Sequence, residues 1–222
     1  MGPNNNEQLI YTQQSLHLGP YGPIMAVMRL GRPIEFDPEK ALDAAVDVFW
    51  CKGYEATSMS DLLTAMKLSK SSLYQSFGSK RQLFTRCLTR YQERFTSELS
   101  HGLKEAKSGR RFIEAVFQAV ADTAQQPEGE KGCLVGNSAS ELGQRDTVFA
   151  KPVAQGLRGL GEVFKAALKR AQTEGDVPPH ADLNALASYL VSSMTGLRTL
   201  IKAGLDKRAA RSMVPLILKA VG

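Results

Sequence analysis

Residues 57–80 read TSMSDLLTAMKLSKSSLYQSFGSK, and this stretch decides the fold of the chain. Its apolar residues recur at helical spacing in two short runs, one that includes Leu62 and Met66 and one formed by Leu73 and Phe77. The few residues between the runs leave room only for a turn. The pattern therefore predicts two short helices joined by a tight turn.

Serines mark where these helices begin. Ser58 and Ser69 each stand just before an apolar run, which is the position of a helix N-cap. Ser79, with Gln82 three residues later, fits a capping box for a longer helix that follows. An earlier helix is expected to begin at Asp37, with Pro38 in its first turn, and to end near residue 53.

The second short helix is expected to present a polar face without a carboxylate. Its side chains offer one ammonium group, several hydroxyls, an amide and a phenol, which suit phosphate oxygens and base edges. The helix is also short enough to enter a major groove. The residues expected on this face are Lys70, Ser71, Ser72, Tyr74, Gln75 and Ser76.

The stretch resembles the helix-turn-helix of TetR-family transcriptional regulators. The resemblance extends from Phe36 to about Arg90 and is most specific in the pattern Ser-Lys-x-x-Leu-Tyr-x-x-Phe-x-x-Lys, which begins at Ser69. It implies an all-α fold, with an N-terminal three-helix DNA-binding domain and a larger C-terminal helical domain for effector binding and dimerisation. The expected domains are residues 34–82 and 83–222.

The chain departs from the family pattern in the turn and on the polar face. The family usually has glycine where this chain has Lys67, and a left-handed residue other than glycine costs about 1–2 kcal/mol. A differently wound turn is therefore one expectation. The family often has glycine or proline where Ser71 stands and histidine where Ser76 stands, although a serine hydroxyl can also donate to phosphate.

The resemblance and the polar face together predict two groups of DNA contacts. Phosphate contacts are expected from Thr57, Ser58, Lys70, Tyr74 and Lys80. Base-edge contacts are expected from Ser71, Ser72 and Gln75, and an amide that forms two hydrogen bonds with adenine would be the most specific of them.

Positive charge is concentrated beside this stretch. The chain has 28 lysines and arginines against 22 acidic residues, a net charge of +6. Between residues 67 and 94 there are seven cations and one anion, so this segment carries the whole excess. A local basic field fits nucleic acid binding, and an ordinary solvated helix face is the alternative.

Residues 1–33 show no periodicity and are expected to form a disordered tail. Arg29 and Arg32, just before the first helix, are candidates for an arm that reaches into a minor groove. A plain basic linker is the alternative, and it is the favoured one of the two.

From Gly109 onward the pattern stays helical, with a loop expected over residues 126–131 and no strand signal. A looser resemblance, in residues 132–142 and 189–204, is to the effector-binding and dimerisation domain of one TetR subgroup. It implies that the last two helices pair across a two-fold axis. The apolar stripe expected in that dimer interface comprises Leu186, Leu190, Met194, Leu197, Met213 and Ile217, and an intrachain core is the alternative.

Aromatic residues in the same part of the chain are candidate walls of an effector pocket, with ordinary core as the alternative. They are Phe95, Phe112, Phe117, Phe149, Phe164 and Tyr189. Cys133, at the start of a predicted helix, is a candidate for a reactive thiol, and a buried inert thiol is the alternative.

Several classes of protein do not fit the sequence. Three cysteines far apart and three isolated histidines indicate no disulfide framework, metal site or cofactor site, and they fit a reducing cytoplasmic compartment. No apolar run approaches the length of a membrane span. Residues 136–140 lack the final glycine of a nucleophile elbow, and no catalytic set is apparent.

The sequence therefore predicts a homodimeric, non-enzymatic transcriptional regulator. The expected mechanism is a repressor that releases a palindromic operator when a small molecule binds its C-terminal domain. The alternative is a helical dimer that binds a small molecule or a protein without sequence-specific DNA recognition.

Overall fold

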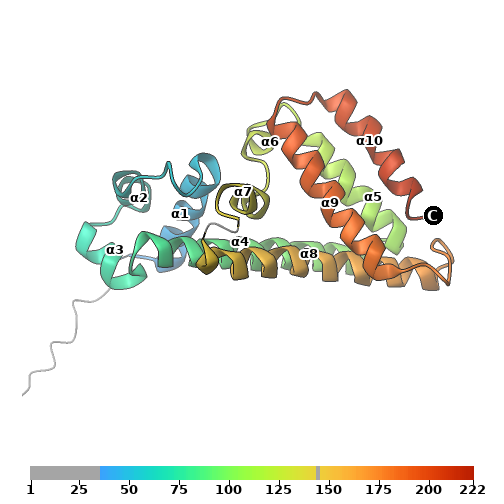
Figure 1. Ribbon diagram of the computed structural model, residues 1–222, viewed down its shortest axis with the longest axis horizontal. Helices are drawn as coiled ribbons and strands as arrows, with labels where there is room; N and C mark the ends of the chain where they lie inside the picture. The colour runs from blue at the N-terminus through green and yellow to red at the C-terminus, as the bar shows by residue number, and fades with distance from the viewer. Residues whose placement is uncertain (1–35, 144–145) are drawn as a thin grey trace, which may run out of the picture. The chain divides into compact units, whose positions relative to one another are not determined.

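A computed structural model describes residues 36–143 and 146–222, and the tail predicted for residues 1–33, with Arg29 and Arg32, lies outside them. The described residues form helices joined by turns and loops, without a strand, which confirms the all-α prediction (Figure 1). The helices are α1 (Pro38–Lys52), α2 (Met59–Met66), α3 (Lys70–Phe77), α4 (Lys80–Glu105), α5 (Gly109–Asp122), α6 (Pro127–Lys131), α7 (Leu134–Glu141), α8 (Thr147–Thr173), α9 (Leu183–Lys202) and α10 (Lys207–Lys219).

The predicted caps are present. Asp37 accepts hydrogen bonds from the backbone N–H groups of Glu39 and Lys40 at the start of α1. Ser58 and Ser79 each complete a capping box at the start of α2 and α4. These side chains satisfy N–H groups that the first turn of a helix leaves without partners, so they fix where each helix begins.

The turn between α2 and α3 is left-handed at Lys67, with φ 54° and ψ 41°. The backbone N–H of Leu68 donates to the carbonyl oxygen of Leu63, which closes the end of α2 in the manner of a Schellman motif. The expectation of a differently wound turn is therefore wrong, because Lys67 takes the conformation that glycine usually takes.

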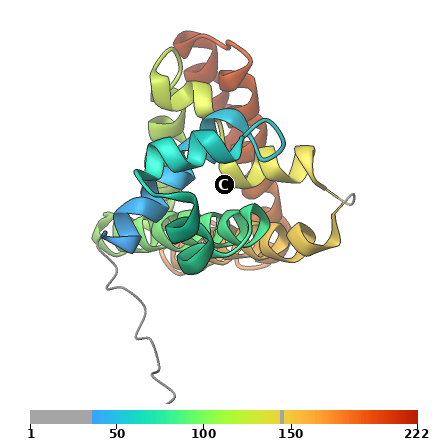
Figure 2. The same cartoon turned by 90° about the vertical axis from the view of Figure 1, so that its left-hand side faces the viewer.

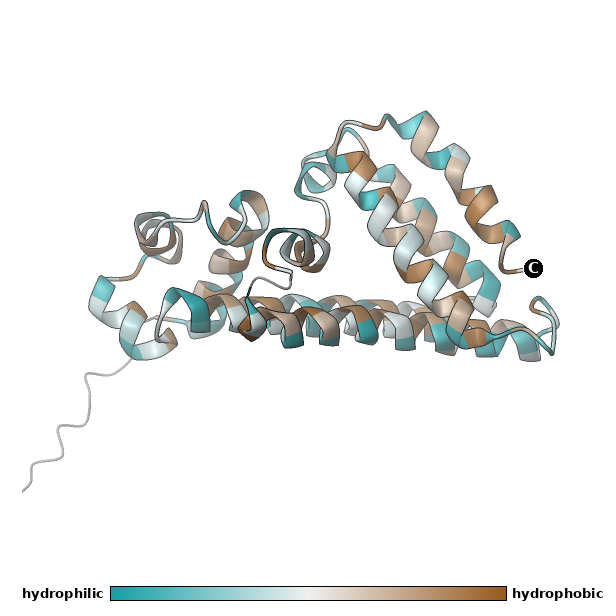
Figure 3. Cartoon of the chain, viewed as in Figure 1, coloured by the Kyte–Doolittle hydropathy of each residue, from teal (hydrophilic) through white to brown (hydrophobic). Residues whose placement is uncertain are grey.

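α4 and α8 run side by side, and most of the remaining helices lie on one side of this pair (Figure 1). α1 packs on α2 and α4, and Figure 1 shows α1, α2 and α3 gathered at one end of α4, the end that faces the viewer in Figure 2. α5 and α9 pack on α8, and α10 packs on α5. Apolar residues line the facing sides of these helices (Figure 3).

Two apolar clusters stabilise the described residues. The first, here called the head core, includes Phe49, Leu62, Leu73 and Phe84 from α1 to α4, and it continues into α7 and α8. The second, the body core, is built from α5, α8, α9 and α10. The domain boundary at residue 82 stays a prediction, but the head core crosses it because Leu134 and residues of α8 belong to it.

The apolar stripe expected in the dimer interface lies inside the subunit. Leu190, Met194 and Leu197 are at most 2% exposed and belong to the body core, as does Ile217. Leu186 and Met213 are half-buried against the same core. The intrachain alternative is correct, because the periodicity of these residues marks the buried side of α9 and α10.

Four of the aromatic candidates are not pocket walls. Phe117 and Phe164 are fully buried and stack on each other in the body core, 5.9 Å between ring centroids. Phe149 is fully buried in the head core against Tyr54. Tyr189 is 39% exposed on the outer side of α9.

Residues 127–131 form the short helix α6 rather than the expected loop, with Pro127 in its first turn. Among the described helices, none is both long enough and apolar enough to cross a bilayer.

Candidate nucleic-acid interface

α3 has one buried side and one open side. Leu73 and Phe77 are at most 3% exposed and anchor the helix to the head core. Lys70, Tyr74 and Gln75 are exposed, and Ser71 is exposed beside them. No carboxylate belongs to this helix, so its outer surface suits an anionic polymer.

The serine hydroxyls at the start of α3 are joined in a cluster. The Ser69 hydroxyl lies 2.9 Å from that of Ser71 and 2.8 Å from that of Ser72, and it accepts the Ser72 backbone N–H. Ser72 is half-buried. The Gln75 amide has no hydrogen-bond partner in the described part of the chain, so it is the freest of the expected base-reading groups.

The residues that flank α3 are less available than the sequence predicted. The Thr57 side chain is 1% exposed and its hydroxyl donates to the Gly53 carbonyl oxygen at 2.5 Å, so the expected phosphate contact through that hydroxyl is corrected to a structural role. The Ser58 hydroxyl donates to the Asp61 carboxylate at 2.8 Å. Lys80 is half-buried, with its Nζ 4.5 Å from the centroid of the Tyr54 ring.

Ser76 is half-buried near the end of α3. Its carbonyl oxygen accepts a hydrogen bond from the Arg86 guanidinium at 2.9 Å, and the same guanidinium lies over the Phe77 ring. Arg86 therefore fixes the end of α3 to α4.

The ion pairs divide the seven cations of residues 67–94 into two groups. Arg81 pairs with Asp146, Arg90 with Asp43 and Glu39, and Arg94 with Glu98. The other cations have no carboxylate within 4 Å in the described residues; they are Lys67, Lys70, Lys80 and Arg86. The basic field is thus narrower than the sequence indicated, and it is centred on α3.

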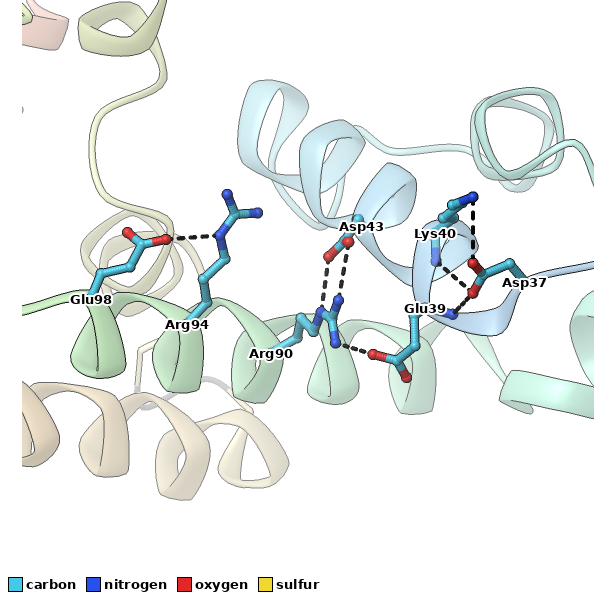
Figure 4. A network of polar contacts seen from close by, with 7 residues as sticks. All are labelled: Asp37, Glu39, Lys40, Asp43, Arg90, Arg94 and Glu98. Carbon is cyan, nitrogen blue, oxygen red and sulfur yellow. Dashed lines mark hydrogen bonds and ion pairs between the residues drawn. The ribbon is translucent and has the colours of Figure 1, made fainter. Parts of the chain in front are cut away.

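Arg90 holds α1 against α4 (Figure 4). Its Nε and Nη2 donate to the two Asp43 carboxylate oxygens at 2.9 and 3.0 Å, and its Nη1 pairs with Glu39. The hydrogen bond from Arg90 lowers the pKa of the Asp43 carboxyl below its usual value. This fork keeps the helix-turn-helix in a fixed orientation on the connecting helix.

α7 makes a second attachment to the head. The Glu141 carboxylate accepts the backbone N–H groups of Tyr54 and Glu55 at 3.0 and 2.7 Å. At the other end of α7, the Gly132 carbonyl oxygen accepts from the Trp50 indole and from Arg198 of α9, both at 3.2 Å. The head is therefore connected to α9 through the segment that carries α7.

Two clefts open beside this connection. One, of about 470 Å³, is lined by residues of α1, α4, α6 and α9, and the other, of about 540 Å³, lies mainly between α4 and α5. Phe95 and Arg198 border both clefts, and Phe112 lines the second. Cys133 borders a smaller apolar cavity next to them, where its Sγ caps α7 by accepting from the Gly136 N–H at 3.4 Å.

An exposed stripe runs along the outer side of α9. Its members recur at helical spacing and are small or apolar; they are Ala185, Tyr189, Ser192, Gly196 and Leu200. Leu216 on the following helix, α10, is 69% exposed. The apolar stripe predicted from the sequence does not include these residues, because small and polar side chains alternate with apolar ones among them. Ser192 and Gly196 do fit the sequence expectation that small residues let two helices approach closely.

No group of three histidine, cysteine, aspartate or glutamate residues that could hold a metal ion occurs in the described ranges.

The head and the body define a class of protein, namely an all-α regulator whose helix-turn-helix is attached to a larger helical domain. Residues 41–87 match the family model described as bacterial regulatory proteins, tetR family. Residues 109–216 match the model described as tetracyclin repressor-like, C-terminal domain. The chain belongs to the TetR family and is a DNA-binding transcriptional regulator, as residues 57–80 predicted.

Individual relatives agree with this assignment. The chain is 31% identical to the HTH-type transcriptional regulator YezE of Bacillus subtilis (strain 168), over 86% of this chain and 100% of that protein. It is 31% identical to the HTH-type transcriptional repressor ComR of Escherichia coli (strain K12), over 78% and 83% of the two chains. Among solved structures, a cysteine mutant of the TetR-family regulator CifR, complexed with a 26-bp double-strand operator DNA, has a TM-score of 0.72 at 28% identity, covering 85% of this chain and 99% of that chain.

Proposed function

We propose that this protein is a homodimeric repressor that binds a palindromic operator through α3. The observation that carries the proposal is the open, carboxylate-free surface of α3, with lysines on it and beside it that have no carboxylate partner among the described residues. The related CifR structure contains operator DNA, which supports the same use of the head here. Lys67, Lys70 and Lys80 hold phosphates, and Gln75 reads a base edge.

A dimer is needed because one short helix contacts only a few base pairs. Two heads related by symmetry contact two half-sites spaced by about 34 Å or a multiple of it. The α9 stripe fits this role, since small residues let two helices approach closely and Tyr189 and Leu200 supply exposed apolar surface. The proposed interface is therefore the outer side of α9 with Leu216 of α10.

The effector site is proposed in the clefts beside α4. Each of the two exceeds about 300 Å³, the lower range for small-molecule sites. The clefts are lined by residues of α1, α4 and α9. Because α4 carries the head and α9 forms the proposed dimer interface, a ligand that prefers one arrangement of these helices changes the separation of the two heads. A coupling of about 1–3 kcal/mol changes operator affinity by roughly 5–150-fold.

The protein acts in the cytoplasm, where its operator is, and it performs no catalysis. The competing function is a helical dimer that binds a small molecule or a protein without reading DNA. The half-buried Ser72 and the buried Thr57 are the observations that favour it.

Binding to the DNA that flanks the gene tests the proposal. Fluorescence anisotropy should show tighter binding to one duplex from this region than to its shuffled sequence, with two subunits bound per site. Equal affinity for all duplexes would favour the competing function instead.

A further inference from the structure

Arg198 lies where the cavities of the body meet. It borders the cleft of about 470 Å³, the cleft of about 540 Å³ and the small cavity next to Cys133. Its Nη1 donates to the Gly132 carbonyl oxygen, and its guanidinium lies 5.3 Å from the centroid of the Phe95 ring. One side of this guanidinium is therefore held in place by the protein.

The other side has no partner. The Arg198 Nε is enclosed by protein and has no hydrogen-bond acceptor in the described residues. No carboxylate of the described chain lies within 4 Å of this guanidinium. An arginine keeps its proton in proteins, so the charge remains and the buried N–H lacks an acceptor.

The other two arginines that line the cleft of about 470 Å³ form ion pairs with carboxylates. Arg90 pairs with Asp43, and Arg94 donates to Glu98 at 3.0 Å (Figure 4). The remaining acids on the walls are Asp47, which pairs with Lys131, Glu105, which pairs with His101, and Glu128 at the start of α6. Arg198 is thus the arginine of the cleft walls that still lacks an anion.

The neighbouring cleft between α4 and α5 is mainly apolar. Its walls include Phe95, Leu99, Phe112, Val116 and Val120. Binding sites for small molecules combine such walls with a few polar groups that fix orientation. An apolar cleft that borders one guanidinium is complementary to an organic acid, which has an apolar body and one carboxylate.

We propose that Arg198 binds the carboxylate of a small organic acid whose apolar body occupies the cleft between α4 and α5. The edge formed by Nε and Nη2 has no acceptor in the described residues, and its two N–H groups match the two oxygens of a carboxylate. Because the Nε is enclosed, the Arg198 side chain shifts toward the cleft when it forms both bonds. This inference rests on the proposed effector site and names the chemical class of its ligand. The Gly132 carbonyl, which Arg198 shares with Trp50, connects the bound carboxylate to α1.

Direct binding without DNA tests the ligand class separately from repression. The probes are phenylacetate, phenylbutyrate and octanoate, each compared with its neutral amide of the same length. Trp50 is the single tryptophan of the chain; it lines the adjacent cleft of about 470 Å³ and shares the Gly132 carbonyl with Arg198, so its fluorescence reports a change at Arg198, and calorimetry gives the affinity. Operator release is measured in a second experiment with the same probes.

At least one carboxylate should bind the wild-type protein about tenfold or more tightly than its amide. Arg198→Met should remove this preference, and Arg198→Lys, which keeps the charge but loses the fork, should retain part of it. Arg158→Met removes the same charge from an exposed position on α8 and should leave the preference unchanged. Circular dichroism and thermal unfolding check that each variant is folded.

Three results would overturn the inference: no carboxylate binds, the amides bind as tightly as the acids, or the full preference survives in folded Arg198→Met protein. Carboxylate binding that leaves operator affinity unchanged would support the site and contradict ligand-controlled release. Release of the operator by a neutral compound in Arg198→Met protein would support ligand-controlled release and contradict the role of Arg198 in binding the effector.

Discussion

The Glu141 carboxylate accepts the backbone N–H of Tyr54 at 3.0 Å, across 87 residues of sequence. The same carboxylate accepts the N–H of Glu55, so the loop that follows α1 is held by α7. A side chain at Gly53 would meet the Glu141 carboxylate at 2.8 Å, and Gly53 has φ +82°, so only glycine suits this close approach. α7 thereby fixes the loop that leads into the helix-turn-helix.

Replacing Glu141 should loosen this loop. Glu141→Ala leaves two backbone N–H groups without their charged acceptor, and we expect a loss of about 1–3 kcal/mol in the free energy of unfolding. Hydrogen exchange should accelerate over residues 53–57. Glu162→Ala, at an exposed position of α8, is the matched control and should change neither quantity. Equal behaviour of the two variants would show that α7 does not hold the loop.

The left-handed turn at Lys67 predicts a stabilising substitution. Lys67→Gly removes the strain of a side chain at φ 54°, about 1–2 kcal/mol, and loses part of this to the greater freedom of glycine in the unfolded chain. We expect a net gain of about 0.5–1 kcal/mol, measured by urea unfolding.

Lys67→Ala is the control for that change, because it removes the same charge but keeps a side chain in the strained conformation. Both variants should weaken DNA binding alike, and only the glycine variant should be more stable. A less stable glycine variant would contradict the left-handed assignment.

The Asp61 carboxylate at the start of α2 predicts a dependence of stability on pH. A hydrogen bond from the Lys52 ammonium, with further bonds from Ser58, lowers the pKa of Asp61 to about 2. Because the folded-state pKa lies below the ordinary aspartate value of 3.8, the stabilisation by this carboxylate is fully present above that value and is lost as the pH falls through about 2.

Acid unfolding of the wild-type protein and Asp61→Asn protein tests this sign. The wild-type protein should be the more stable of the two at neutral pH, and the difference should shrink as the carboxyl becomes protonated. A difference that stays constant to the lowest pH at which both proteins fold would show that the charge of Asp61 contributes nothing.

Gly196 tests the proposed dimer surface without disturbing the subunit. A Cβ added at this position would meet no atom of another element within 4 Å in the described part of the subunit. Gly196→Arg should therefore leave the subunit folded and raise the dimer dissociation constant by about tenfold or more, or about 1.4 kcal/mol. Sedimentation measures the change, with Ala166→Arg on α8 as the control. A Gly196→Arg dimer as stable as wild type would place the interface elsewhere.

Gln75 and Lys70 should differ in what they contribute to DNA binding. Gln75→Ala should relax the preference at one base position by about 1–3 kcal/mol, because the free amide is the expected base reader. Lys70→Ala should weaken binding to all duplexes alike and reduce the salt slope by about 1 per subunit. If the two variants behave identically on every duplex, the division into base and phosphate contacts is wrong.

Local signals in the sequence predicted the head well. The N-caps at Asp37, Ser58, Ser69 and Ser79, together with the apolar spacing of the short helices, are interactions within a few residues. Such interactions leave a readable pattern. The helix boundaries and the buried side of α3 could therefore be predicted from the sequence alone.

Long-range pairings could not be predicted in this way. Periodicity places Leu190 and Leu197 on one side of α9, but it does not say whether their own chain or a second copy covers them. The same holds for charge, because Arg81 and Arg90 look free in the sequence and are neutralised by acids 65 and 47 residues away. Glu141 carries no local signal at all, since its partners are backbone N–H groups of the head.

The most direct test of the central claim is the salt dependence of binding to a duplex from the flanking DNA. If each subunit neutralises three phosphates through Lys67, Lys70 and Lys80, the dimer neutralises about six, and log affinity should fall with log salt at a slope near −5. The account predicts this slope, together with tighter binding than to a shuffled duplex at every salt concentration. A slope near zero, or equal affinity for both duplexes, would contradict it.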